Sequence, residues 1–321
     1  MTPRTLCLGE ALIDSVTSAA GTAEHVGGSP LNVAVGLARL GHPTTLGSWW
    51  ARDARGDRIA AAMQEAGVAV EPGSDAAAFT TVAHATLDAD GSASYTFELD
   101  PGVAPLGNLS RMGHLHTGSL GAVLEPGGTE IRNALATARP FATISYDPNA
   151  RPTLMGPADQ ARDRMEALIS LADIVKASDE DLAWLYPDTA IEQVMHAWAE
   201  LGPALVVITV GASGALVQSR RNRAPIRVPA MPVQVSDTVG AGDSFMAGLL
   251  GGLLDAGLVG DATARDRLAQ APLATWQPAI QQAIAAAGLT VAHAGAYAPT
   301  PGEVAEVIPT VWPPTGRSAD R

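Results

Sequence analysis

Two glycines and an acidic residue precede a helical segment late in the chain. The segment, residues 237–245, reads DTVGAGDSF. Successive N–H groups of Gly240, Ala241 and Gly242 can point at one place, and the helix that follows adds its positive dipole end, so this turn suits an anion. Asp243 beside it could take the proton of an attacking hydroxyl while the turn stabilises a transferring phosphoryl group. The alternative is a glycine-rich turn with an acidic helix cap.

The same segment resembles the C-terminal signature of the ribokinase-like (PfkB) carbohydrate kinases, and matching pieces follow in the expected order over nearly the whole chain. Residues 9–14 (GEALID) are similar to the family's first strand, and residues 27–32 (GGSPLN) to its sugar-binding turn. The resemblance implies that Asp14, Gly28 and Asn32 hold sugar hydroxyls. A carboxylate accepts from vicinal hydroxyls, an amide donates and accepts, and glycine lets the ring approach the backbone.

Residues 209–214 (TVGASG) follow an apolar run and resemble the family's nucleotide-binding turn. Small residues let the backbone approach phosphates, so the resemblance implies that Thr209, Gly211 and Gly214 bind ATP. A tight turn between strands 205–209 and 215–218 is compatible with this role.

Residues 147–151 (DPNAR) resemble a string common in the fructokinase and 2-keto-3-deoxygluconate kinase branches. Arg151 could then neutralise a phosphate or a substrate anion. A surface arginine after a turn is an equally good interpretation, because a long flexible cation needs positioning before it contributes.

Residues 290–296 (TVAHAGA) resemble the family loop that encloses a monovalent cation together with the segment that starts at Asp237. Most of the implied ligands are main-chain carbonyls, and hard oxygen ligands of this kind suit K⁺. The implied ligands are the carbonyls of Val239, Thr290, His293 and Gly295 and the carboxylate of Asp237.

One family motif is altered. The N-x-x-E motif, which organises Mg²⁺ and its waters near the phosphates, appears as residues 178–181 (SDED). Ser178 replaces the asparagine, and Asp181 keeps the charge of the glutamate with a shorter reach. Binding of Mg²⁺ by Asp181 through water is therefore a hypothesis. The alternative is that these acids open a surface helix, where negative charge is favoured at the N-terminus.

The lysine and histidine content restricts which kinds of catalytic or metal site the chain can form. Lysine occurs once, at Lys176, so a Walker A loop with its G-K-[ST] is excluded and no other lysine can form a Schiff base. His114 and His116 would share one face of a strand and could chelate a metal, but no second cluster completes a site.

Bulk composition favours a small-molecule partner. The 321 residues include 20 basic and 33 acidic side chains, and the net charge of −13 disfavours nucleic acid and anionic membrane. Four Phe and four Tyr offer few stacking platforms for bases. The single Cys7 excludes an intramolecular disulfide, and with no apolar leader and no stretch of eighteen apolar residues we expect a cytoplasmic protein.

The elements that must position these residues alternate between short β-branched or apolar runs and longer Ala- and Leu-rich segments. This βαβα pattern predicts an α/β fold with a mostly parallel sheet covered by helices, and the resemblance implies the three-layer ribokinase-like form. The expected strands are 5–9, 114–117, 143–147, 174–176 and 205–209, and the expected helices include 31–40, 244–254 and 278–287.

One region breaks this alternation. Residues 81–87 and 94–99 are strand-like and flank residues 88–91 (DADG), a good hairpin turn. We expect one domain over residues 1–308 and a C-terminal tail over 309–321. The β lid of that domain would come from about residues 12–28 and 79–100.

Fructose or a related neutral sugar is the expected substrate, because residues 9–14, 27–32 and 147–151 together look like the fructokinase branch. Kinases of 2-keto-3-deoxygluconate usually carry Tyr and Arg along the second hairpin strand to hold the substrate carboxylate. Here that strand ends in Glu98 and Asp100, which would repel a carboxylate. A 2-keto-3-deoxygluconate kinase and a ribose or nucleoside kinase remain alternatives.

The resemblance implies ATP-dependent phosphorylation of a primary sugar hydroxyl, with Mg²⁺ and K⁺ as cofactors and a homodimer formed through the lids as one arrangement. A protein of another class, a non-catalytic sugar- or nucleotide-binding sensor, is favoured by Ser178 and Asp181 and disfavoured by the intact residues 240–243. A nucleotide-binding dehydrogenase would need G-x-G-x-x-G directly after the first strand, and none follows Gly9.

Overall fold

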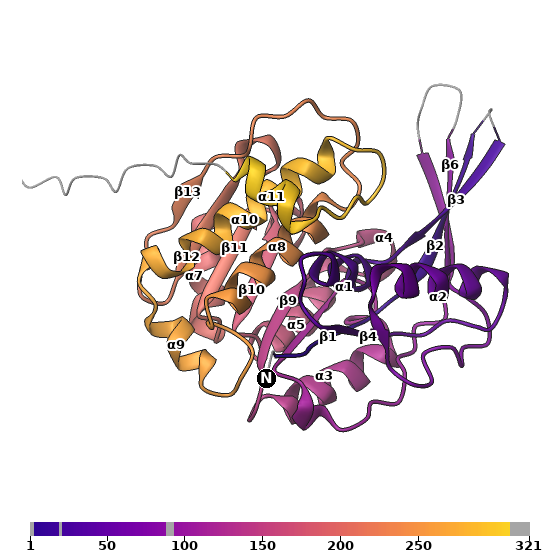
Figure 1. Ribbon diagram of the computed structural model, residues 1–321, viewed down its shortest axis with the longest axis horizontal. Helices are drawn as coiled ribbons and strands as arrows, with labels where there is room; N and C mark the ends of the chain where they lie inside the picture. Colours follow the sequence, from indigo (N-terminus) through magenta and orange to yellow (C-terminus); the bar gives the residue numbers. More distant parts are fainter. Residues whose placement is uncertain (1–2, 19–20, 88–92, 309–321) are drawn as a thin grey trace, which may run out of the picture.

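A nine-stranded sheet is the largest element of the computed structural model, which describes residues 3–18, 21–87 and 93–308 (Figure 1). The strand order is β13-β12-β11-β10-β9-β8-β1-β4-β5, and every neighbouring pair from β11 to β5 is parallel. Only β12 and β13 run antiparallel to their neighbours. The strands are β1 (Thr5–Leu8), β4 (Thr44–Gly47), β5 (Ala69–Val70), β8 (His114–Gly118), β9 (Thr143–Asp147), β10 (Ile174–Ser178), β11 (Leu205–Thr209), β12 (Ala215–Ser219) and β13 (Ile226–Val228).

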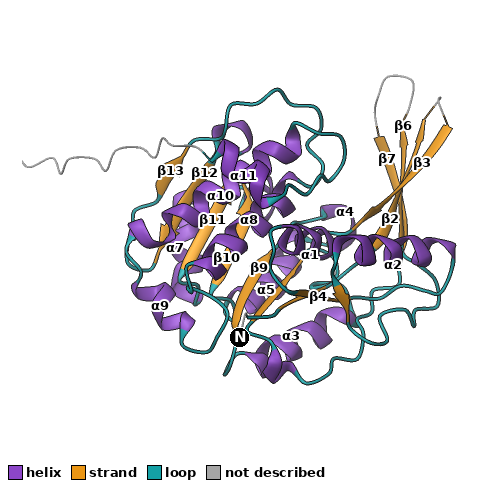
Figure 2. Ribbon diagram, viewed as in Figure 1, coloured by secondary structure: helices purple, strands orange, loops and turns teal. Residues whose placement is uncertain are grey.

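Helices cover both faces of this sheet (Figure 2). One core lies under α1 (Ser29–Arg39), α2 (Ala54–Ala66), α8 (Ala241–Asp255), α9 (Ala264–Gln270) and α10 (Leu273–Val291). The other lies under α3 (Gly127–Ala138), α4 (Pro152–Met155), α5 (Ala158–Ile169), α6 (Asp179–Leu185) and α7 (Ile191–Leu201), while α11 (Pro301–Val307) packs on α10. Because side chains alternate along a strand, Val207 enters the first core, and its neighbours Val206 and Ile208 enter the second. The predicted three-layer α/β fold is confirmed.

A second sheet projects from the body of the molecule (Figure 1). Its order is β3-β2-β6-β7, built from β2 (Leu12–Ser18), β3 (Gly21–Gly27), β6 (Val82–Leu87) and β7 (Ala93–Glu98). Glu24 on β3 forms ion pairs of 2.7 Å with Arg55 and Arg58 of α2, which tie an edge of this lid to the body. The predicted hairpin is present, and its expected turn at 88–91 lies outside the described residues.

Some element boundaries differ from the sequence-based expectation. Helix α10 was expected over 278–287 but begins at Leu273, so that Pro278 lies inside it. A proline near the N-terminus removes one backbone bond, and burial of Trp276 and Ile280 on the core face offsets that loss. Helix α8 begins at Ala241, three residues before the expected start, which places Asp243 in its first turn.

The predicted tail, residues 309–321, also lies outside the described residues. Within the described part of the chain, no helix is both long and apolar enough to cross a membrane.

Helix α8 packs closely on its neighbours through small residues. A Cβ added at Gly252 would lie 2.5 Å from the Cα of Ala279 on α10, and one added at Gly36 of α1 would lie 2.6 Å from the Cβ of Ala247 on α8. These contacts bring the helix backbones closer than larger side chains allow. Because α8 carries Asp243 at its N-terminus, this packing sets the position of that carboxylate.

We predict that Gly252→Ala lowers the free energy of unfolding by about 1–3 kcal/mol, because the added methyl meets the backbone of α10. Urea denaturation followed by circular dichroism measures this change. The matched control is Gly302→Ala in α11, where no atom lies within 4 Å of the added Cβ. There the same substitution should be neutral or stabilise by up to about 1 kcal/mol. A Gly252→Ala protein as stable as the control would contradict this account of the α8–α10 contact.

Candidate active site

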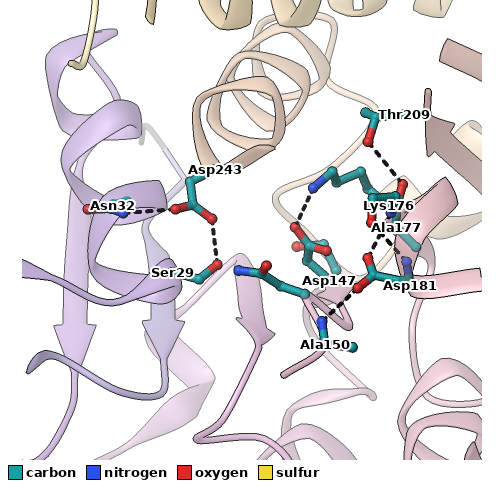
Figure 3. Close-up of polar contacts among 12 residues, drawn as sticks. Ser29, Asn32, Asp147, Ala150, Lys176, Ala177, Asp181, Thr209 and Asp243 are labelled. Carbon is teal, nitrogen blue, oxygen red and sulfur yellow. Dashed lines mark hydrogen bonds and ion pairs between the residues drawn. The ribbon is translucent and has the colours of Figure 1, made fainter. Parts of the chain in front are cut away.

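Asp243 lies buried at the N-terminus of α8, facing the first turn of α1 (Figure 3). The Ser29 hydroxyl donates to its Oδ1 over 2.6 Å, and the Asn32 side-chain amide donates to its Oδ2 over 2.8 Å. Burial raises the pKa of Asp243, whereas these two hydrogen bonds act in the opposite direction by favouring the charged form. The carboxylate is therefore held in one orientation by two donors from another helix.

Free backbone amides occur in the same helix turn as Asp243. Gly240 is the N-cap of α8 and has a φ of 75°, a left-handed conformation that favours glycine. The amides of Gly240, Gly242 and Asp243 donate to no acceptor in the described part of the chain, while the Ala241 amide donates to the carbonyl of Thr238 over 3.3 Å. The free donors thus differ by one residue from the expected set, 240–242. Together they form a potential anion-binding site at a helix N-terminus.

The predicted sugar-binding residues meet beneath the lid. Gly28 has a φ of 114°, and a Cβ there would lie 2.4 Å from the carbonyl oxygen of Glu10, so only glycine fits. Asp14 on β2 lies against Gly27, where a Cβ would come within 2.1 Å of its Oδ2. Burial raises the pKa of Asp14, and the charge on Asp243 acts in the same direction, which places the two carboxylates within electrostatic reach of each other.

A buried ion pair lies next to this helix terminus. The Nζ of Lys176, on β10, is 2.8 Å from Oδ2 of Asp147, at the end of β9, and both side chains are almost fully buried (Figure 3). A Cβ added at Gly242 would lie 2.9 Å from the same Nζ. Burial raises the pKa of Asp147 to about 6, although Lys176 acts in the opposite direction.

Asp181 lies in the first turn of the neighbouring helix, α6, whose N-cap is Ser178. Its Oδ1 accepts from the Ala150 amide over 2.7 Å and its Oδ2 from the Ser178 amide over 2.8 Å. The alternative interpretation is confirmed in that the acids of this segment occupy the first turn of α6, where Ser178 and Asp181 form a capping box, although Asp181 itself is buried. Each carboxylate oxygen keeps a further lone pair, so Asp181 can still accept from a metal-bound water. Among the described residues, no three His, Cys, Asp or Glu side chains are grouped to bind a metal directly.

The turn at residues 209–214 lies at the same edge of the sheet. Thr209 ends β11 beside Ser178 of β10, and its hydroxyl donates to the Ala177 carbonyl over 3.3 Å. The Val210 amide donates to the Gly214 carbonyl over 2.8 Å and closes the turn. In parallel sheets ligands bind beyond the carboxyl ends of the strands, and here β9, β10 and β11 all bring polar residues to that edge.

Comparison with known proteins identifies the family. Residues 5–302 match the pfkB family of carbohydrate kinases. The chain belongs to that family. This PfkB protein is a sugar kinase, and the non-catalytic sensor is set aside.

Its relatives and structural neighbours include fructokinases. The fructokinase of Rhizobium leguminosarum bv. trifolii is 34% identical over 261 residues, which cover 77% of this chain and 79% of that protein. The crystal structure of fructokinase with bound ATP from Xylella fastidiosa superposes with a TM-score of 0.82 at 27% identity, covering 96% and 98% of the two chains. A fructokinase double mutant from Vibrio cholerae O395, in a form with bound fructose, ADP and potassium ion, gives 0.76 at 25% identity, covering 96% and 99%.

The implied cation loop of this PfkB kinase is held together by Asp237. Its Oδ1 accepts from the Val239 amide over 3.0 Å and its Oδ2 from the Gly295 amide over 2.8 Å, and both bonds hold its pKa below the usual value. The carbonyl of Thr290 accepts from the His293 amide, and that of Gly295 from the Tyr297 amide. Each carbonyl keeps a lone pair, so the implied ligand set fits a monovalent cation.

Arg151 lies exposed at the mouth of the site. Its guanidinium donates to the side-chain oxygen of Asn149 over 2.8 Å and to the Ala150 carbonyl over 2.9 Å. Its charge still acts to lower the pKa values of Asp14 and Asp243. Arg151 is therefore both a surface arginine and a cation beside the predicted site.

The two histidines of the candidate metal pair are buried inside the sheet. His114 bonds Thr143 and Ser145 over 2.8 and 2.9 Å, and His116 bonds Ser145 over 2.9 Å. Burial lowers the pKa of each imidazole to about 3. Both rings are therefore neutral and form part of a polar network within the core.

Three residues at the site were not predicted from the sequence to belong to it. Ser29 occurs within the sugar-binding turn, but nothing local shows that its hydroxyl reaches Asp243. Asp147 belongs to the DPNAR motif, but no role was predicted for it. Lys176 offered a signal that could have been used, because the only lysine of the chain stands within an apolar strand segment.

We predict that Ser29→Ala raises the pKa of Asp243, because it removes a donor that stabilises the charged carboxylate. The ¹³C chemical shift of the Asp243 carboxyl group, followed during a pH titration, measures the change. Ser110→Ala, at an exposed site in the short helix Leu109–Arg111, is the control and should leave that titration unchanged. An equal pKa in both variants would show that the Ser29 contact does not hold Asp243.

Proposed function

We propose that this kinase transfers the terminal phosphoryl group of ATP to the primary hydroxyl of fructose or a closely related neutral sugar, with Asp243 as the general base. The observation that carries the proposal is the buried Asp243 carboxylate, oriented by Ser29 and Asn32 beside three free amides. A base next to an anion site meets the two main needs of phosphoryl transfer. The fructokinases among the relatives support the choice of sugar.

In the proposed reaction the sugar lies between the lid and the first turn of α1. Asp14 and the backbone at Gly28 bind its hydroxyls, and the Asn32 side-chain oxygen accepts another while its NH₂ group remains on Asp243. Asp243 takes the proton as the hydroxyl oxygen attacks phosphorus. The hydrogen bonds from Ser29 and Asn32 favour the charged form of Asp243, which is the form that can act as a base.

The nucleotide is proposed to lie along the carboxyl edge of the sheet. Thr209, Gly211 and Gly214 would approach its phosphates, and the ATP-bound neighbour supports this partner. Asp181 would hold a Mg²⁺ ion through waters, and that ion would supply positive charge to the phosphate oxygens. Gly240, Gly242 and Asp243 direct their amides at the charge that develops during transfer, with Ala241 between them.

The charge around the predicted sugar site supports a neutral substrate. Asp14 and Asp243 lie within electrostatic reach of each other, and burial raises the pKa of the half-buried Glu10. A substrate carboxylate would be repelled there. Arg151 is the one feature that favours the alternative, a kinase of 2-keto-3-deoxygluconate.

We predict that Asp243→Asn lowers kcat by roughly 10²–10⁴-fold, because the amide cannot accept the proton. The measurement is ATP consumption with Mg²⁺ and K⁺ over fructose, tagatose, ribose, 2-keto-3-deoxygluconate and nucleosides. Asp14→Asn is the comparison and should mainly raise KM for the sugar. If Asp243→Asn turns over within a few-fold of the wild type, Asp243 is not the general base. If only another sugar of the panel is phosphorylated, that sugar replaces fructose as the proposed substrate.

We propose K⁺ as the cation of the loop formed by Asp237 and residues 290–295, and predict that Asp237→Ala abolishes activation by K⁺. The substitution removes one ligand and both hydrogen bonds that hold the loop. Phosphorylation rates in KCl and in choline chloride measure the activation. Asp261→Ala is a matched control, because Asp261 also accepts backbone amides but lies at the start of α9. Equal activation in all three proteins would contradict the assignment.

A homodimer through the lid is a further part of the proposal. The four-stranded lid stands away from the body and has two edge strands, β3 and β7 (Figure 2). Sedimentation should give twice the 32.8 kDa chain mass. A monomer at assay concentration would remove the dimer and leave the kinase assignment unaffected.

A further inference from the structure

Lys176 is the only lysine among 321 residues, and it is buried on the central strand β10. An ammonium group carries three N–H donors, and burying it is costly unless they are used. Asp147 accepts one of them, and no other acceptor among the described residues does so. Two donors of a buried cation are thus left for a group from outside the chain.

The ammonium group of Lys176 lies close to Gly242. A side chain at Gly242 would come within 2.9 Å of the Lys176 Nζ, so the cation lies against the first turn of α8. The amides of Gly242 and Asp243 in the same turn are also free. Two kinds of unused donor, charged and neutral, therefore occur together at one helix terminus (Figure 3).

The surrounding charges keep Lys176 protonated. Burial alone would lower its pKa, but Asp147, Asp181 and Asp243 together raise it above the usual value. Lys176 therefore does not act as a proton acceptor near neutral pH. It is a fixed positive charge, set in an acidic site that must receive a polyanion.

We propose that Lys176 is a catalytic residue of this kinase, whose ammonium group binds the phosphoryl group being transferred, and that Asp147 is the positioning residue that holds it there. The inference rests on the proposed function. In the step, the sugar oxygen forms a bond to the terminal phosphorus, the bond from that phosphorus to the bridging oxygen of ADP breaks, and Asp243 takes the hydroxyl proton. Lys176 stays protonated and stabilises the non-bridging oxygens, as an oriented cation does in phosphoryl transfer.

The competing explanation is a purely structural ion pair. Removing one partner of a buried pair leaves an uncompensated charge and lowers stability whatever its role, so Lys176→Met alone does not distinguish the two. The double variant Lys176→Met/Asp147→Asn removes both charges together. The control is Arg265→Met/Asp173→Asn, which removes another buried carboxylate together with its ion pairs to Arg265 and Arg139.

Turnover and nucleotide binding of these two double variants separate the explanations. The Lys176/Asp147 variant should lose about 10²–10³-fold in kcat, with KM for the sugar within a few-fold. It should also bind a non-hydrolysable ATP analogue more weakly while binding ADP almost as before. The Arg265/Asp173 variant should keep both properties. Equal loss of analogue and ADP binding, or kcat within about threefold of the control, would overturn the proposal.

A second measurement needs no variant. Lysine labelled with ¹⁵N at Nζ gives a single side-chain signal in this protein, because Lys176 is its only lysine. The non-hydrolysable ATP analogue should move that signal far more than ADP does, and equal shifts would overturn the proposal even if the double variant failed to fold. If the analogue binds and moves the signal but no sugar in the panel is phosphorylated, the proposed substrate fails while the phosphate contact stands.

Discussion

The hydrogen bonds from Ser29 and Asn32 to Asp243 are the contact on which the rest of the site depends. A buried carboxylate is costly unless donors compensate for the lost water, and these two donors come from a different helix. They reach Asp243 only because α1 and α8 pack closely at Gly36 and Ala247. The small residues at the α1–α8 contact therefore set the geometry of the candidate site from a distance.

Parallel strands explain why the remaining polar groups gather at one edge. The carboxyl ends of β9, β10 and β11 bring Asp147, Lys176 and Thr209 to the same side of the sheet, next to the N-terminus of α8. The buried Asp147 carboxylate and the buried Lys176 ammonium group compensate each other through their ion pair. The chain is acidic overall, and the positive groups at this edge are free amides and one buried ammonium rather than a basic surface.

The lid links the predicted sugar-binding residues to the body of the molecule. Strand β2 carries Asp14, and β3 leads directly into Gly28 and the first turn of α1. The ion pairs from Glu24 to Arg55 and Arg58 fix the edge strand against α2. A movement of the lid would thus move Asp14 relative to Asp243, so lid position and site geometry are coupled.

The α/β class, the hairpin and the two central strands at 143–147 and 205–209 could be predicted from the sequence, because they depend on local periodicity and turn chemistry. The resemblance to the family was carried by the motif residues themselves. It did not reveal that Pro278 lies inside α10 or that the Ala241 amide is engaged, since packing and cap geometry decide those points. The Ser29–Asp243 contact joins residues 214 positions apart, and the partner of Lys176 lies on a neighbouring strand. These pairings could not be predicted from the sequence, because the packing of α1 on α8 and the order of strands in the sheet bring distant residues together.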